Sequence, residues 1–183
     1  LQENYDYLRS KGYDAERIKH MILRKPEIIV MNINTLESKR KIFLSFGYND
    51  DEINYLMGIN PALYTLSIQN ILDKFKYFVD KGYTKEETRF IMLKLPNIFS
   101  YSKDGLDEKI EVLSQNGLEA EILNRPSYLM QGALLSYARM EFLKENNIVL
   151  NHKAFNYLMM SSKDFEKRFG LSNDEIKERY SVK

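Results

Sequence analysis

The sequence predicts an all-α fold, an α-solenoid (superhelix) of helical repeats with a period of about 35 residues. Two residue types predict it, because glycines recur at a fixed interval and prolines keep step with them. The spaced glycines are Gly12, Gly47, Gly82 and Gly117, and the prolines are Pro26, Pro61, Pro96 and Pro126. Each of the first three prolines follows its glycine by 14 residues. Self-similarity at a fixed period of this size is typical of stacked repeat units.

The fourth unit is shorter than the others. Pro126 follows Gly117 by 9 residues instead of 14. Asn147 then stands 21 residues after Pro126, where the earlier units have glycine, and Asn is the usual substitute for Gly in the left-handed conformation. We therefore predict one helical-repeat domain over residues 1–183. Its expected parts are units of about 12–46, 47–81, 82–116 and 117–146, a partial unit 147–160 and a C-terminal cap 161–183.

Each unit is expected to hold two helices joined by a short turn. The first helix begins at a capping residue after the glycine and ends before the proline, which has no N–H to donate. The expected caps are Asp14, Asn49 and Thr84, the last two with a glutamate that completes a capping box. The short apolar segment after each proline predicts a 3₁₀ turn. The second helix is expected to begin at Asn34, Ser67 or Ser102 and to end at the next glycine.

Apolar residues at helical spacing mark the faces that these helices bury. In the first helices they are Ile18, Met21, Ile22, Ile53, Leu56, Met57, Phe90, Ile91 and Leu93. In the second helices they are Leu36, Phe43, Ile71, Phe75, Phe78, Leu106, Ile110, Leu113, Met140 and Leu143. A helix pair cannot bury both apolar sides alone, so the units are expected to stack.

The C-terminal residues are expected to cover the end of the stack. Residues 152–160 predict a helix. Ser162 is the expected cap of a helix over 163–169 that Gly170 ends, and Ser172 is the expected cap of a polar helix over 173–180.

Composition disfavours an enzyme. The chain has no cysteine, which excludes a disulfide, a thiolate metal site and a cysteine nucleophile, and its only histidines are His20 and His152. Ser38 and Ser100 each begin a Ser-x-x-Lys string, but both strings lie where repeat helices are expected to start. No phosphate loop or nucleophile elbow is present. We therefore expect no catalytic residues, no cofactor and no metal site, and no apolar run is long enough to span a membrane.

The units resemble those of the mitochondrial transcription termination factor (mTERF) family. The shared pattern is Gly-Tyr, a polar cap, Glu-x-Ile, then Leu-x-x-Pro-x-Ile and a Ser before the second helix. It is seen in Gly47–Ile53 and Pro61–Leu63, and in Gly82–Thr84 and Pro96–Ser100. Leu23, Leu93 and Leu123 stand three residues before their prolines, whereas Gly58 takes that place in the second unit. The resemblance spans about residues 5–170.

The resemblance implies a left-handed superhelix of units with two α-helices and a 3₁₀ turn. It also implies nucleic-acid binding, mostly of double-stranded DNA, through a basic concave groove, with roles in organellar transcription, its termination, RNA processing or ribosome assembly. Some family members present a partner protein. The expected protein is an intracellular monomer without a membrane partner, in the mitochondrion or plastid of a eukaryote or the cytoplasm of a bacterium. Duplex DNA is the favoured partner, and RNA is possible.

Two recurring sets of basic residues are candidates for binding nucleic acid. The first set stands 13 residues after each proline and consists of Lys39, Lys74, Lys109 and Arg139, with Arg40 beside it. It lies at the edge of the buried stripe, where a cation either contacts phosphate or extends over apolar surface. The second set directly precedes the prolines and consists of Arg24, Lys25, Lys94 and Arg125. Cations there also complement the helix dipole without any ligand.

The formal net charge is only +1, from 27 basic and 26 acidic residues. Any basic surface must therefore come from the arrangement of charges and not from bulk composition. The near-neutral charge favours an alternative function, a protein-interaction scaffold whose concave surface holds a protein partner. The two basic sets and the family resemblance favour nucleic-acid binding.

Overall fold

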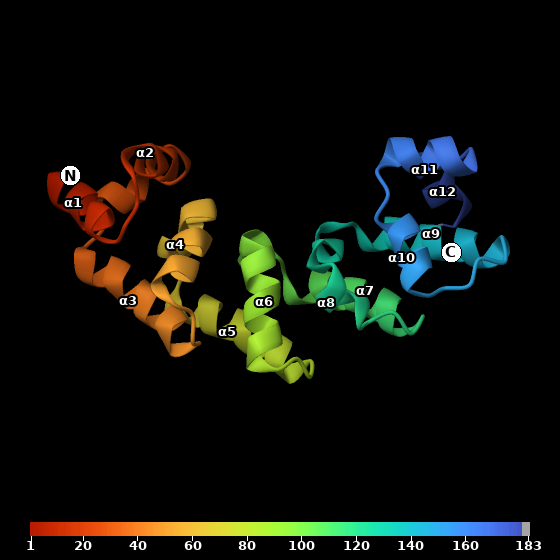
Figure 1. The fold of residues 1–183 in the computed structure, drawn as a ribbon, viewed down its shortest axis with the longest axis horizontal. Helices are drawn as coiled ribbons and strands as arrows, with labels where there is room; N and C mark the ends of the chain where they lie inside the picture. The colour runs from red at the N-terminus through yellow and green to blue at the C-terminus, as the bar shows by residue number, and fades with distance from the viewer. Residues whose placement is uncertain (181–183) are drawn as a thin grey trace. The chain divides into compact units, whose positions relative to one another are not determined.

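The computed structural model describes residues 1–180 and confirms the all-α fold (Figure 1). These residues form twelve α-helices and four 3₁₀ helices, and no strand occurs among them. The contacts group into two compact units, Leu1–Ser100 and the chain from Tyr101 onward, and each is described by itself. The single domain and its repeat boundaries stay predictions, and residues 181–183 of the predicted cap lie outside the described part.

The N-terminal unit alternates first helices, 3₁₀ turns and second helices. Its elements are α1 (Gln2–Ser10), α2 (Ala15–Arg24), η1 (Pro26–Val30), α3 (Ile33–Ser45), α4 (Asp50–Ile59), η2 (Pro61–Tyr64), α5 (Ile68–Asp80), α6 (Lys85–Lys94) and η3 (Pro96–Ser100). The predicted caps of the first helices are confirmed. The Asp14 side chain accepts from the Arg17 N–H, and Asn49 and Thr84 form capping boxes with their glutamates. No helix was predicted before Gly12, yet α1 ends two residues before this glycine, as α3 ends two residues before Gly47.

The C-terminal unit contains the short repeat and the cap. Its elements are α7 (Lys103–Ser114), α8 (Glu121–Asn124), η4 (Pro126–Met130), α9 (Ala133–Glu145), α10 (His152–Leu158), α11 (Ser162–Phe169) and α12 (Asn173–Arg179). Helix α8 is a single turn of four residues, whereas α2, α4 and α6 have ten each. The fourth repeat is therefore shorter than the others because its first helix is shorter. Helices α10 and α12 both contact α9.

The predicted helix stops are confirmed by the backbone. The left-handed residues on the repeat spacing are Gly12 (φ 95°), Gly47 (φ 92°), Gly82 (φ 96°), Gly117 (φ 67°) and Asn147 (φ 57°). After Gly47, the Tyr48 N–H donates to the Phe43 carbonyl at 3.2 Å, and the Ile148 N–H after Asn147 donates to the Leu143 carbonyl at 2.9 Å. These bonds satisfy the last carbonyls of the second helices.

Several predicted boundaries were wrong by one or two residues. Helix α3 is capped by Asn32, whose side chain accepts from the Asn34 N–H at 2.8 Å, and Ser161 caps α11 instead of Ser162. In both cases two nearby residues have side chains that can cap a helix. The residue whose backbone is extended is the one that caps it. Helix α10 ends at Leu158 and α12 at Arg179, earlier than predicted.

The predicted buried face of α6, the first helix of the unit that begins at Gly82, was partly wrong. Phe90 is 39% exposed and Leu93 is half-buried, while Ile91 and Met92 are fully buried. Thr88, one turn before Met92, completes the buried face of α6, so the stripe is rotated from the one that apolarity alone predicted. No helix in the described part of the chain is long and apolar enough to cross a membrane.

Candidate nucleic-acid interface

The basic residues 13 positions after the prolines are buried. They lie on the second helices α3, α5, α7 and α9. The exposed fractions are 7% for Lys39, 6% for Lys74, 8% for Lys109 and 1% for Arg139. A side chain that packs over an apolar surface and leaves its charge in water would be far more exposed. These residues therefore face the interior of their units.

Three of these side chains donate to backbone carbonyls of the following repeat. Lys39 Nζ donates to the Leu66 carbonyl after η2, and Lys109 Nζ donates to the Leu129 carbonyl in η4 at 2.7 Å. Arg139 Nη1 donates at 2.8 Å to each of two carbonyls at the end of α10, those of Leu158 and Met160. In α3, α7 and α9 the recurring cation thus attaches the second helix to the next repeat.

Burial also lowers the proton affinity of these groups. It lowers the pKa of Lys39 and of Lys109 below the usual lysine value, and it lowers the pKa of Arg139 to about 10. The carbonyls that these cations meet are neutral and do not restore the lost hydration, and for Lys109 the nearby Glu108 carboxylate offsets it only in part. Arg139 also lies over the Phe165 ring, 4.3 Å from its centroid.

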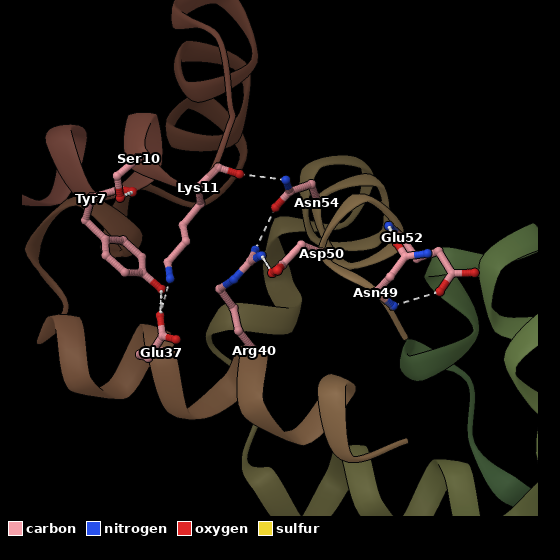
Figure 2. A network of polar contacts seen from close by, with 9 residues as sticks. All are labelled: Tyr7, Ser10, Lys11, Glu37, Arg40, Asn49, Asp50, Glu52 and Asn54. Carbon is pink, nitrogen blue, oxygen red and sulfur yellow. Dashed lines mark hydrogen bonds and ion pairs between the residues drawn. The ribbon is translucent and has the colours of Figure 1, made fainter. Parts of the chain in front are cut away.

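Arg40 is the centre of a polar network in the N-terminal unit (Figure 2). It is 1% exposed, and its guanidinium donates at 2.7 Å to Asn54 Oδ1 and at 2.7 Å to Asp50 Oδ1. Asn54 in turn donates to the Lys11 carbonyl at 2.6 Å. Lys11 Nζ lies 2.9 Å from the Glu37 carboxylate. The network joins α3 and α4 to the end of α1.

Burial and these bonds indicate a structural role for Lys39, Arg40, Lys109 and Arg139, and Lys74 is buried to the same degree. A phosphate could reach the charged groups of the first four only by displacing bonds that hold neighbouring repeats together. The burial of Lys39, Arg40, Lys74, Lys109 and Arg139 therefore does not favour phosphate contact at these residues.

The second basic set is accessible. Arg24, Lys94 and Arg125 are exposed and Lys25 is half-buried, at the C-terminal ends of α2, α6 and α8. Arg24 Nη1 donates to the Ile59 carbonyl of α4 at 2.9 Å, a bond that leaves most of its side chain in solvent.

The end of α4 has no cation at the two positions before its proline, which are Ile59 and Asn60. Asn60 is buried, and its side chain donates to the Pro96 carbonyl at 2.8 Å.

Charge is segregated along the first helices. Their first turns are acidic, with Glu16 in α2, Asp50 and Asp51 in α4, and Glu86 in α6. The cations of the second set stand at the opposite ends. Each helix is thus acidic where it begins, and α2, α6 and α8 are basic where they end, as the helix dipole favours. The near-neutral formal net charge of +1 is therefore compatible with a local separation of charge along these helices.

The described residues hold no group of three or more His, Asp or Glu side chains placed to bind a metal ion. His152 Nδ1 lies 2.8 Å from the Glu121 carboxylate, which links α10 to the start of α8. Burial alone would raise the pKa of Glu121, but hydrogen bonds from Asn124 and His152 outweigh it and hold the pKa below its usual range.

The fold and the recurring turns define this protein as an α-helical repeat protein. The model of the mTERF family matches residues 1–166, most of the chain. The chain belongs to the mTERF family, whose members are non-enzymatic helical-repeat proteins that bind nucleic acid. No curated protein sequence matches it.

Proposed function

We propose that this protein binds double-stranded DNA and regulates transcription, including its termination. The observation that carries this proposal is the family match over residues 1–166. The protein acts as a monomer inside the cell, in the mitochondrion or plastid of a eukaryote or in the cytoplasm of a bacterium.

The exposed cations at the ends of the first helices support this proposal. Arg24, Lys25, Lys94 and Arg125 are the candidate residues with accessible side chains. Long, exposed cations neutralise backbone phosphates and release condensed counterions, which supplies affinity without reading sequence. We therefore propose a grip on duplex shape and phosphate, with few direct contacts to base edges.

Binding of three labelled nucleic acids of one sequence tests the proposal. Fluorescence anisotropy is measured with a 25-base-pair duplex, the single DNA strand and the matching RNA, each at several salt concentrations. We expect the duplex to bind most tightly and its affinity to fall steeply as salt rises. Tighter binding of the RNA would contradict the DNA assignment, and no binding at low salt would favour the protein scaffold.

A further inference from the structure

The second helices of the C-terminal unit form a groove between α7 and α9. The two helices contact each other, and the groove has a volume of about 310 Å³. Helix α7 lines it with Glu108, Glu111 and Val112, and α9 lines it with Leu134 and Tyr137. Residues three or four apart lie on one face of a helix. One wall therefore presents two carboxylates, and the other presents an aliphatic and an aromatic side chain.

The charge of the α7 wall is opposite to that of the N-terminal unit. The residue 15 positions after the proline is exposed in α3, α5 and α7. It is a lysine in the first two of these helices and a glutamate in α7 and α9, namely Lys41, Lys76, Glu111 and Glu141. At this position the charge therefore changes from positive to negative between the two units.

Both carboxylates of the groove lack an ion pair within the described chain. Glu108 lies near Lys109, but the buried amino group of that lysine donates to a backbone carbonyl instead. Glu111 accepts a hydrogen bond from the Gln115 amide at 3.0 Å, and an amide carries no charge. At the corresponding place in α9, Glu141 pairs with a lysine three residues on, at 2.7 Å. The groove thus keeps two negative charges that are open to a cationic partner.

The α9 wall is apolar at a place where the other repeats are polar. Eight residues after the proline stands Leu134, and the other repeats have Asn34, Gln69 and Asp104 there. Leu134 is 47% exposed, and Tyr137 is half-buried with no hydrogen bond to its hydroxyl from the described residues. A single exposed leucine is ordinary on a protein surface. An apolar row beside two unpaired carboxylates is more specific, because it combines two kinds of contact.

The groove lies within the row of repeats. Repeat units pack against one another end to end, so a further unit at either end would cover the end of the row and not the space between α7 and α9. Helix α9 already contacts α10 and α12 as well as α7, and Leu134 stays exposed. The exposure of the groove is therefore a property of these two repeats.

We propose that the groove between α7 and α9 binds an amphipathic helix of a partner protein. The partner helix carries a row of Lys or Arg residues beside a row of apolar residues. Its cations pair with Glu108 and Glu111, and its apolar row packs on Leu134 and Tyr137, which is the usual way for a helix to bind in a groove. The same carboxylates repel phosphate, so this surface does not suit nucleic acid.

A designed helical peptide is the probe for this groove. It consists of four copies of Lys-Leu-Ala-Ala with both ends blocked, so that a row of lysines lies beside a row of leucines. It is titrated at low salt into the ¹⁵N-labelled 183-residue chain, and amide chemical shifts are followed by NMR. We expect saturable shifts centred on residues 108–115 and 133–137. Shifts centred elsewhere, or none, would overturn the proposal.

A second peptide tests the charge of the partner. It has glutamate in place of every lysine and should bind at least 10-fold more weakly. Equal affinities of the two peptides would overturn the assignment to a basic helix.

Two pairs of chain variants test the two walls. Glu108→Gln should weaken binding of the lysine peptide at least 3-fold, and Glu166→Gln, at another exposed carboxylate without an ion pair, should leave it within 1.5-fold. Leu134→Asn should weaken it at least 3-fold, and Val149→Asn, at a residue that is 74% exposed, should again leave it within 1.5-fold. All four changes are at exposed side chains, so the fold should be retained. Equal effects of groove and control variants would overturn the proposal.

Two further measurements distinguish other occupants. A 25-base-pair duplex should not shift the amides of residues 108–115 and 133–137, and shifts there would overturn the proposal because the groove would then bind DNA. Sedimentation velocity of the chain alone should show a monomer. A dimer that Glu108→Gln or Leu134→Asn dissociates would overturn the assignment to a partner protein, because a second copy would then occupy the groove.

Discussion

Two sets of basic residues recur with the repeats, and they differ in what the folded chain does with them. The set on the second helices is buried, and Lys39, Lys109 and Arg139 donate to backbone carbonyls of the next repeat. In the set at the ends of the first helices, Arg24, Lys94 and Arg125 are exposed and Lys25 is half-buried. The period of a cation along the sequence therefore does not reveal its role. Burial separates the residues that hold the repeats together from those that are free to contact phosphate.

The largest difference between the sets is expected at Arg139 and Arg125. Arg139→Met should lower the free energy of unfolding by about 3–5 kcal/mol, because it removes three charge-assisted hydrogen bonds and leaves buried carbonyls unpaired. Arg125→Met should change it by less than about 0.5 kcal/mol, since Arg125 is exposed. Urea denaturation of both variants checks this. Equal losses would mean that burial does not separate the two sets.

A smaller difference is expected between two lysines. Lys109→Met keeps the apolar part of the side chain but removes the donor to the Leu129 carbonyl, so we expect a loss of about 1–2 kcal/mol. Lys94→Met should be neutral within about 0.5 kcal/mol. Thermal unfolding followed by circular dichroism measures both. A neutral Lys109→Met would show that its bond contributes nothing net.

Loss of a glycine that ends a helix should lower the free energy of unfolding about as much as Lys109→Met does. Gly82 has φ 96° and no atom within 4 Å of an added Cβ, so a substitution there reports backbone strain alone. Gly82→Val should cost about 1–2 kcal/mol in urea denaturation. Gly132 has φ −68° and equally open space, so Gly132→Val serves as the control and should cost less. The reverse order would contradict the left-handed assignment.

Two acidic residues also differ in burial, and we expect a smaller difference in their effects on stability. Glu121 is 9% exposed and its pKa is lowered, whereas Glu86 is exposed. A lowered folded-state pKa stabilises the fold above the unfolded value of about 4.3, and this stability is lost as pH falls through the folded value. Glu121→Gln should therefore remove part of the acid sensitivity below about pH 4.3, by less than about 1 kcal/mol.

Glu86→Gln is the matched control and should leave the pH dependence of unfolding unchanged. Urea midpoints between pH 3 and pH 7 compare the two variants. Identical profiles for both would show that the bonds from Asn124 and His152 have no net effect.

The repeat architecture could be predicted because its signals are local. A left-handed turn favours Gly or Asn and a helix end tolerates Pro, so Gly82 and Pro96 mark boundaries without knowledge of the tertiary structure. The role of the recurring cations could not be predicted in this way. Lys39 stands at the edge of an apolar stripe, and only the position of the Leu66 carbonyl, 27 residues away, decides that its amino group is covered.

The most direct test of the central claim is the salt dependence of duplex binding. Replacing Arg24, Lys25, Lys94 and Arg125 together with Gln should reduce the slope of log affinity against log salt by about 0.9 per residue on duplex DNA. The matched control replaces Lys76, Lys144, Lys163 and Lys167 with Gln, which removes the same charge from exposed sites elsewhere, and should leave most of the slope. Equal slopes for the two variants, or an unchanged slope in the first, would contradict the account.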